Sequence, residues 1–411
     1  MIHRPFYGWI VVAGGFLVLF LAYGTQYAFG IFFGALLAEF GWSRASLAGA
    51  FSVYTVAYTL CGVAAGRLTD RWGPRMVIAI GGGFLGLGLI GMSRTTQLWH
   101  PYVLYGIVAA LGMSTAYVPC AATAARWFVR QRGLAIGVTS AGISAGAFAL
   151  PPVAYFLVSH VGWRWAYVAF GAAILIGLNV IAPFMRRDPE SVGLTPDGLP
   201  AGAPSGVERV SAETWTVSLA MQTRAFWMLL ATFTATWAPV FIPLVHLVPL
   251  ARGLGISALL ATTAVSALGV ADLCGRLLTG AASDRLGRRT TLAIGLVLQA
   301  GAFVLLAAAG GMPALYAGAM LFGFSYGAVS TMFPAMIADF FGRARAGTLV
   351  GVFFAVAGAT SALGPLAAGF IYDRQGSYGT ALVMSAGCNA LALALLAFTH
   401  APTRRDGESW S

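Results

Sequence analysis

Apolar runs of about 20 residues, each long enough to cross the hydrocarbon core of a bilayer as a helix, alternate with short polar segments along almost the whole chain. The alternation predicts an all-α membrane protein with twelve transmembrane helices in two six-helix bundles, separated by a polar segment rich in Pro, Gly, Ser and charge. The predicted helices cover residues 8–37, 45–66, 76–93, 99–124, 134–158, 165–185, 225–250, 258–281, 290–309, 313–338, 347–370 and 378–399.

The predicted domain organisation follows from this alternation and from an internal repeat. We expect a six-helix bundle at 1–185, a cytoplasmic loop at 186–223, a second bundle at 224–400 and a cytoplasmic tail at 401–411. The sequence Gly-Arg-Leu-Thr-Asp-Arg-Trp-Gly-Pro-Arg at 66–75 is matched by Gly-Ala-Ala-Ser-Asp-Arg-Leu-Gly-Arg-Arg at 280–289, an offset of 280 − 66 = 214. Each half thus carries a basic Gly-Asp-Arg loop after its second helix, which indicates a duplicated fold.

Composition and charge support a membrane protein and set its orientation. Only 9% of the residues are charged and 59% are hydrophobic, whereas a soluble domain has about 25% charged residues. All 24 basic residues are arginines, which excludes a Schiff-base or P-loop lysine. The net charge of +11 does not indicate nucleic acid, because the arginines lie in short loops, where they set topology. Eighteen lie on the side of the termini, the central loop and the Gly-Asp-Arg loops, five lie on the other side, and Arg276 lies inside a helix, so both termini are predicted to be cytoplasmic.

No arrangement typical of an enzyme or a cofactor site occurs in the sequence. The four cysteines are far apart and show no CxxC spacing, so no metal or redox site is predicted. The Gly81-Gly82-Gly83 run lies inside a predicted helix and no Walker motif occurs, so we expect no phosphate loop and no ATP-driven step. The prediction is a protein that is not an enzyme and needs no cofactor or metal.

One charged pair interrupts the apolar sequence of the predicted helix 258–281. Asp272 and Arg276 are spaced i, i+4 and therefore share one face of the helix. An ionisable side chain at membrane depth costs at least about 2.5–3.5 kcal/mol on insertion scales and usually marks an ion or substrate pathway. Arg276 precedes the loop at Gly280 by four residues, which places it about 6 Å from the cytoplasmic end of the helix, with Asp272 nearer the middle. The alternative is an intrahelical salt bridge that only neutralises both charges.

The repeated loop resembles that of a known superfamily. The pattern Gly-x-x-x-Asp-Arg-x-Gly-x-Arg, present at 66–75 and at 280–289, is similar to the signature loop of the major facilitator superfamily. The layout of six helices, a loop and six helices extends this resemblance over the whole chain. The resemblance implies two helical bundles that alternate access around a central cavity.

Further motifs resemble one family within this superfamily, the monocarboxylate transporters. Residues 127–137 with Gly142 resemble the helix 4–5 signature of that family, the Asp272–Arg276 pair resembles its helix 8 charge pair, and Tyr7-Gly8-Trp9 is a looser likeness to its first signature. Oxalate/formate exchangers share much of this pattern. One departure is clear: where animal monocarboxylate transporters place a helix 1 lysine, this chain has Tyr-Ala-Phe-Gly-Ile at 27–31.

The charged residues receive distinct predicted roles. Arg276 is the predicted substrate ligand, because a guanidinium holds a carboxylate through two parallel hydrogen bonds. Asp272 is the predicted proton-coupling residue, because a carboxylate that loses its partner charge in a low-dielectric site favours its protonated form. His246 lies near the extracellular end of the helix 225–250 and is expected to sense external pH or to gate the cavity; an interfacial or hydrogen-bonded core histidine is the alternative.

The uncharged lining of the cavity rests on the resemblance. It implies that the first and fourth helices of each half line the cavity, and for each side chain the alternative is packing or a helix–helix hydrogen bond. The candidates for substrate contact are Tyr23, Tyr27, Tyr117, Ser144, Tyr326 and Ser330.

The resemblance also implies cytoplasmic charge networks that hold the two halves in one state. Positive-inside topology alone explains the arginines of the repeated loops but not their aspartates. The predicted network residues are Asp70, Arg71, Arg75, Arg126, Asp284, Arg285, Arg289 and Asp339.

These patterns predict a secondary active transporter that carries a small monocarboxylate such as lactate or pyruvate with a proton. An anion exchanger of the oxalate/formate type and a transporter of a neutral or aromatic solute are the alternatives. A dicarboxylate usually requires two cations, whereas Arg276 is the cation predicted inside the membrane. The predicted partners are the small carboxylate, a proton and the lipid bilayer, with no nucleic acid. We expect a monomer in a bacterial inner membrane.

Overall fold

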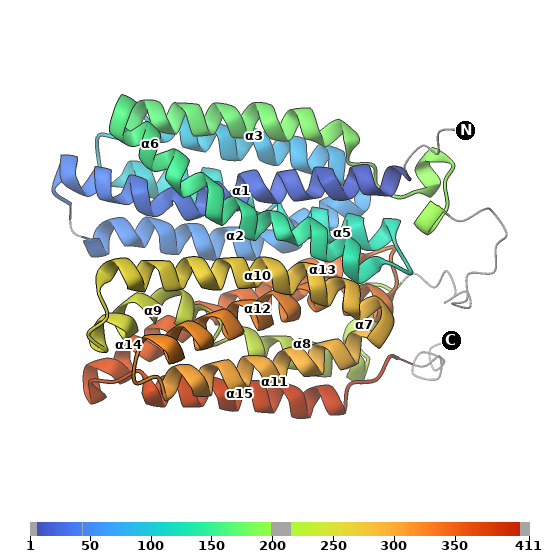
Figure 1. The fold of residues 1–411 in the computed structure, drawn as a ribbon. Coiled ribbons are helices and arrows are strands. Elements are labelled where there is room, and N and C mark those ends of the chain that lie inside the picture. The colour runs from blue at the N-terminus through green and yellow to red at the C-terminus, as the bar shows by residue number, and fades with distance from the viewer. Residues whose placement is uncertain (1–5, 43, 199–214, 403–411) are drawn as a thin grey trace, which may run out of the picture. The chain divides into compact units, whose positions relative to one another are not determined.

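The protein is described by a computed structural model in which residues 6–42, 44–198 and 215–402 are placed. Within these ranges the chain is helical and contains no strand, which confirms the predicted all-α class (Figure 1). The α-helices are α1 (Tyr7–Phe40), α2 (Arg44–Trp72), α3 (Pro74–Met92), α4 (Ala110–Met113), α5 (Tyr117–Trp127), α6 (Arg132–Ile181), α7 (Val217–Met221), α8 (Arg224–Trp237), α9 (Phe241–Gly253), α10 (Ala258–Leu286), α11 (Arg288–Ala307), α12 (Met312–Phe341), α13 (Ala346–Ser361), α14 (Leu363–Gln375) and α15 (Gly379–Ala397). A π-helix, η1 (Pro101–Ala109), precedes α4, and 3₁₀ turns form η2 (Ala182–Phe184), η3 (Glu190–Val192) and η4 (Pro196–Gly198).

Among the described residues, eleven helical stretches are long and apolar enough to span a membrane. One of them, 132–184, is 53 residues long and contains Gly162 at φ 79°, a conformation that interrupts the helix. The predicted helices 134–158 and 165–185 lie on the two sides of this glycine. The structure is therefore consistent with the predicted twelve spans, two of which are joined in α6.

Three predicted spans are divided into shorter helices. The span 99–124 becomes η1, α4 and α5, with residues 114–116 between α4 and α5. The span 225–250 becomes α8 and α9, and Pro239 lies in the segment between them. Proline has no N–H to donate and restricts the residue before it, so it favours such a break. The span 347–370 becomes α13 and α14, which separate at Ala362. Interrupted helices are a frequent source of binding-site backbone in transporters.

The two repeated segments have the same local structure, and both are helical for longer than predicted, because 66–72 and 280–286 are the last residues of α2 and α10. Arg276 therefore lies ten residues, or about 15 Å, before the end of α10 and not about 6 Å as predicted. Gly73 and Gly287, which are 287 − 73 = 214 residues apart, both have positive φ, 83° and 86°. Each precedes the first residue of the next helix, α3 or α11. Only glycine adopts this conformation at low cost, which explains why both copies of the repeat carry it.

The chain divides into two compact units. The first unit holds residues up to 130, residues 138–208 and the beginning of α13 at 346–355; the second holds the beginning of α6 at 131–137, residues 209–345 and residues from 356 onward. The predicted central loop at 186–223 and tail at 401–411 are only partly covered, because 199–214 and 403–411 lie outside the described residues.

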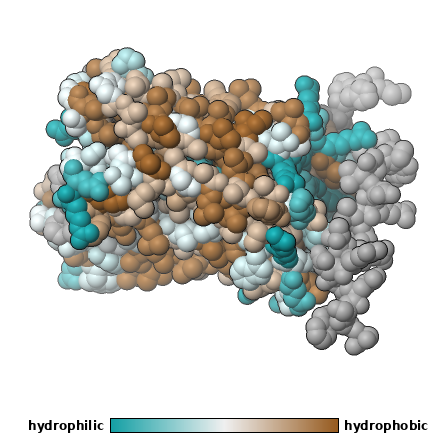
Figure 2. All heavy atoms as spheres, turned by 90° about the horizontal axis from the view of Figure 1, so that it is seen from below, coloured by the Kyte–Doolittle hydropathy of each residue, from teal (hydrophilic) through white to brown (hydrophobic). Residues whose placement is uncertain are grey.

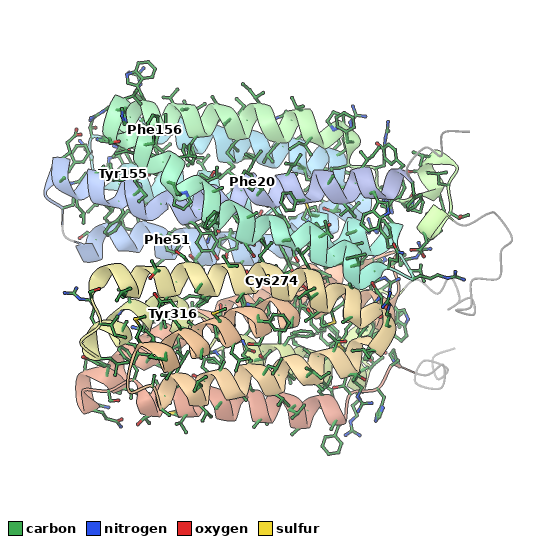
Figure 3. All side chains as sticks on the ribbon, in the orientation of Figure 1. Phe20, Phe51, Tyr155, Phe156, Cys274 and Tyr316 are labelled. Carbon is green, nitrogen blue, oxygen red and sulfur yellow. The ribbon has the colours of Figure 1, made fainter. Side chains whose placement is uncertain are left out.

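Apolar side chains are widely exposed on the helices. Leu366, Ile176 and Leu278 have exposed fractions of 71%, 63% and 61%. Figure 2 shows one face, on which apolar side chains predominate along the helices and hydrophilic ones gather near the helix ends. Tyr155 and Phe156 on α6 are likewise exposed, at 65% and 59% (Figure 3). Surfaces of this kind face lipid, and the chain is a multi-pass membrane protein.

Candidate substrate site and charge networks

The charged pair lies buried inside α10. The exposed fractions of Arg276 and Asp272 are 1% and 6%. Nε of Arg276 donates to Asp272, 3.0 Å from Oδ1 and 3.1 Å from Oδ2. The i, i+4 spacing thus brings the two groups into contact, as the sequence predicts. A buried guanidinium beside a carboxylate is costly unless the geometry satisfies both.

Glycines bring α12 against α10 at the charged pair. A Cβ added at Gly327 lies 2.3 Å from the Asp272 carbonyl oxygen and 2.8 Å from the Arg276 nitrogen. A Cβ at Gly323, one turn earlier, lies 2.1 Å from the Leu268 oxygen. In the other direction, a Cβ at Gly275 on α10 lies 2.1 Å from the Phe324 oxygen. These are contacts that no larger residue allows, so the small residues fix the α10–α12 crossing where the ion pair lies.

Aromatic side chains flank the guanidinium. The Cζ of Arg276 is 5.3 Å from the ring centroid of Tyr326 on α12, within cation–π range. The ring of Trp237, at the end of α8, lies 6.0 Å from the Tyr326 ring and 5.8 Å from that of Phe333. The predicted residues Arg276, Asp272 and Tyr326 therefore meet in one place, and Trp237 extends the aromatic surface there.

Ser330, another predicted contact, follows Tyr326 by one turn of α12. Its hydroxyl donates to the Gly327 carbonyl at 3.0 Å. The start of α6 also reaches α10: a Cβ added at Gly137 lies 2.4 Å from the Arg276 carbonyl oxygen. The backbone of Arg276 is thus packed against α6 as well as α12.

The predicted contacts in the first unit differ in their surroundings. Tyr117 is buried and its ring lies 5.2 Å from that of Phe354. Tyr23 and Ser144 are also buried, whereas Tyr27 is 41% exposed. Near Ser144, α6 approaches α1 closely, because a Cβ added at Gly142 lies 2.1 Å from the Phe16 oxygen. Substrate contact by these four residues stays a prediction.

His246 lies on α9 beside α14. Its Nε2 is 3.1 Å from the Pro365 carbonyl oxygen, and its ring is 4.8 Å from that of Tyr378. Burial, together with Tyr372 and Asp373, raises the pKa of Tyr378 above its ordinary value, so that hydroxyl stays neutral at physiological pH. The surroundings of His246 fit the hydrogen-bonded alternative for this histidine as well as a gate, and its role in proton coupling stays a prediction.

Asp70 anchors the beginning of α13. Its carboxylate accepts hydrogen bonds from the backbone N–H groups of Gly347 (3.1 Å) and Thr348 (2.7 Å) and from the Thr348 hydroxyl (2.5 Å). A negative charge at a helix N-terminus is stabilised by the helix dipole. Arg126 forms a salt bridge with the same carboxylate. Two of the predicted network residues are therefore paired with each other.

Asp284 repeats this arrangement at the beginning of α6. It accepts from the backbone N–H groups of Gly133 (2.8 Å) and Leu134 (2.9 Å). The offset of 214 relates Asp284 to Asp70 and Gly347 to Gly133, so the repeat extends to the bonded partners. Arg288 bonds Asp284 at 2.5 Å through Nη1.

A second carboxylate enlarges this network. Asp339, near the end of α12, forms a salt bridge with Arg132, and its Oδ2 lies 3.3 Å from Nε of Arg288. The sequence predicts Asp339 as a network residue but does not single out Arg132 or Arg288. Arg132 is nevertheless visible in the sequence, inside the Arg-Gln-Arg-Gly segment at 130–133 that precedes the fifth helix.

The other predicted network arginines of the repeated loops are Arg71, Arg75, Arg285 and Arg289. Arg289 donates to the Ala397 carbonyl oxygen at 2.6 Å. Within the described ranges, Arg71, Arg75 and Arg285 form no salt bridge with an acidic side chain. Their part in gating stays a prediction.

Sequence patterns missed several residues at the site. Trp237 was not singled out, because nothing in a linear sequence shows that the end of one helix meets the middle of another. Gly323 and Gly327 do carry a signal, the small-xxx-small spacing that allows close helix crossings. No group of three or more His, Cys, Asp or Glu side chains that could hold a metal occurs in the part of the chain that the structure describes.

A bundle of membrane-length helices with a buried ion pair in one of them is an arrangement typical of solute transporters. The sequence profile of the Major Facilitator Superfamily matches residues 15–269 and 228–410. The chain belongs to this superfamily, as its repeated loops predict.

Relatives with known names show which transporters of this superfamily the chain resembles. The chain is 27% identical to monocarboxylate transporter 13 of Bos taurus over 388 residues, which cover 92% of this chain and 86% of that protein. It is 26% identical to monocarboxylate transporter 12 of Rattus norvegicus over 422 residues, 97% and 86% of the two chains. It is 29% identical to the MFS transporter asaE of Aspergillus flavus over 382 residues, 90% and 81% of the two chains. The predicted resemblance to monocarboxylate transporters is confirmed, and these relatives are transporters rather than enzymes.

Solved structures show the same fold at lower identity. The human organic anion transporter MFSD10 (TETRAN) superposes with a TM-score of 0.72 at 18% identity, covering 96% of this chain and 100% of that chain. The proton:xylose symporter XylE superposes with a TM-score of 0.75 at 15% identity, covering 96% of each.

Proposed function

We propose that this protein is a secondary transporter that moves a small monocarboxylate together with a proton by alternating access. The observation that carries the proposal is the buried Asp272–Arg276 pair, with 6% and 1% exposure, at the α10–α12 crossing. Membrane proteins keep such charges where they act on a substrate or an ion. The likeness to monocarboxylate transporters supports the choice of substrate class.

Arg276 is the proposed anchor for the substrate carboxylate. Its guanidinium presents several N–H donors in a planar fork, and the Asp272 carboxylate uses Nε. The Tyr326 ring beside it provides an apolar surface for the remainder of the substrate. One guanidinium suits one carboxylate, which favours a monocarboxylate over a dicarboxylate.

Asp272 is the proposed proton carrier. A substrate carboxylate that binds Arg276 competes with Asp272 for the same positive charge. Asp272 then has a weakened partner in a low-dielectric site, where the neutral form of a carboxyl group is favoured. One proton taken up with one monocarboxylate leaves the net charge of the site unchanged, so this chain needs no helix 1 lysine for coupling.

The charge networks are the proposed gate on the side of the repeated loops. Asp70 and Asp284 each bind the first backbone N–H groups of another helix, and those bonds must break for that helix end to move away. Arg126, Arg132, Arg288 and Asp339 reinforce the closed arrangement. From the arginine distribution we place this side and both termini in the cytoplasm, and we propose that the monomer is the working unit.

Uptake by purified protein in liposomes tests the substrate class. Labelled lactate, pyruvate, formate and oxalate are offered with and without an inward proton gradient. We expect saturable uptake of lactate or pyruvate that accumulates against its own gradient when protons flow inward. Uptake of oxalate that requires internal formate, and ignores the proton gradient, would instead indicate an anion exchanger. If the protein takes up none of these four compounds, the proposal is contradicted.

Asp272→Asn is expected to separate binding from proton coupling. Asparagine keeps the size of the side chain but neither carries a charge nor takes up a proton. Wild-type protein is expected to accumulate more lactate at an external pH of about 5.5 than at about 7.5. We expect Asp272→Asn to lose this difference but to retain lactate–lactate exchange. Wild-type protein measured in both assays is the reference. Undiminished proton-driven accumulation by the variant would remove Asp272 from the mechanism.

A further inference from the structure

A buried polar chain joins three helices behind the aromatic surface of the site. Thr236 on α8, Gln299 on α11 and Asn389 on α15 are each 0% exposed. The Thr236 Oγ1 lies 2.9 Å from Gln299 Oε1 and 2.8 Å from Asn389 Oδ1. None of these residues lies in the charge networks or contacts the ion pair.

The number of hydrogen-bond donors determines which side chain donates to which in this polar chain. A hydroxyl has one hydrogen, so Thr236 donates to only one of the two oxygens. Asn389 Nδ2 donates to the Ser385 carbonyl at 3.2 Å, which orients Asn389 with Oδ1 toward Thr236. In the described part of the chain, Gln299 Nε2 is buried without a hydrogen-bond partner. With the Gln299 amide turned so that Nε2 faces Thr236, Gln299 donates to Thr236 and Thr236 donates to Asn389, so both short contacts of the Thr236 hydroxyl are hydrogen bonds.

This polar chain holds α8 at its last turn. Thr236 is the residue before Trp237, and α8 ends at Trp237. Successive residues of a helix point about 100° apart, so Thr236 faces α11 and α15 while Trp237 reaches Phe333 and Tyr326 on α12. Apolar packing alone permits a helix to slide or rotate, whereas a directional hydrogen-bond chain to two neighbours sets its register.

We propose that Thr236, Gln299 and Asn389 are positioning residues that hold Trp237 and thereby the aromatic surface beside Arg276. The inference rests on the proposed carboxylate site and adds a determinant of its shape. It assigns no contact with the substrate to the three residues. Loss of the polar chain is expected to change the affinity for substrates that extend beyond the carboxylate, and to do so more than it changes the rate of the transport cycle.

The variant Thr236→Val removes the hydroxyl and keeps the shape of the side chain. Uptake of lactate and of 3-phenyllactate is measured for wild type, Thr236→Val and Thr236→Ser. We expect Thr236→Val to raise KM for 3-phenyllactate by about 3–10-fold with a smaller change for lactate and little change in maximal rate, because one misplaced wall weakens binding by a modest factor. Thr236→Ser keeps the hydroxyl and is expected to restore KM.

Thr232→Val is the matched control. Thr232 is one turn earlier on α8, is equally buried, and donates only within its own helix, to the Met228 carbonyl at 2.7 Å. If Thr232→Val and Thr236→Val have the same KM values for both probes, the polar chain serves only helix packing and the inference is wrong. A wild-type protein that takes up neither probe overturns the proposed function and this inference with it.

A triple variant keeps the test decisive if Thr236→Val folds poorly. Thr236→Val with Gln299→Leu and Asn389→Leu removes every polar group of the chain, so no unsatisfied group stays buried. We expect its melting temperature in detergent to recover toward that of wild type while KM for 3-phenyllactate stays raised. Recovery of KM along with the melting temperature contradicts a positioning role.

Discussion

Arg276→Gln is expected to abolish saturable lactate uptake, with a fall of about 100-fold or more in transport efficiency. Charge-assisted hydrogen bonds contribute about 1.5–3 kcal/mol each, and a bidentate carboxylate loses two of them. Arg276→Lys keeps the charge but presents no planar fork, so it is expected to recover only part of the uptake. Initial rates in liposomes over a range of lactate concentrations give the comparison.

Stability must be separated from binding in this experiment. Arg276→Gln leaves Asp272 as a buried charge whose principal partner is gone, a change that typically costs about 3–5 kcal/mol. The double variant Arg276→Gln with Asp272→Asn removes both charges and is expected to restore the melting temperature but not the uptake. Arg252→Gln, which removes an exposed arginine at the end of α9, serves as the matched control and is expected to transport normally. Normal lactate uptake by Arg276→Gln would falsify the proposed site.

Gly327→Ala is expected to eliminate most transport by a single added methyl group. Its Cβ lies 2.3 Å from the Asp272 carbonyl oxygen, and backbone cannot give way as a flexible side chain can. The α10–α12 crossing must widen, which moves Tyr326 and the ion pair apart. Overpacking of this kind typically costs about 1–3 kcal/mol of stability. Uptake rates and melting temperature, measured on the same preparation, report both effects.

Gly269→Ala is the control for the general effect of alanine in a transmembrane helix. Gly269 also lies on α10, and a Cβ added there meets no atom within 4 Å. Alanine has the higher helix propensity, so this variant is expected to be at least as stable as wild type and fully active. If Gly327→Ala transports as well as Gly269→Ala, the close crossing is not needed for the function of the ion pair.

The charged site was predictable from sequence where its contacts are local. The Asp272–Arg276 contact follows from an i, i+4 spacing, and the paired loop aspartates follow from the repeat. The partners of those aspartates did not follow. Asp70 binds backbone N–H groups 277 and 278 residues away, and Arg132 pairs with Asp339 across 207 residues. Every residue except proline has a backbone N–H, so the identity of a residue does not show whether its N–H binds a carboxylate. The helix N-termini that bind these aspartates therefore cannot be recognised from composition or pattern.

Contiguous segments of the sequence suffice to predict the class of protein. The lengths of the apolar runs, the repeated loops and the arginine distribution are properties of contiguous segments, and the bilayer imposes helices on them because their backbone groups must bond internally. The helices that meet at the ion pair are known only from the folded arrangement. Trp237 beside Tyr326, Gly327 against Asp272, and Thr236 bonded to residues 63 and 153 positions away all depend on how separate helices pack. Packing is set by the shapes of two surfaces together, and one segment of sequence describes only one of them.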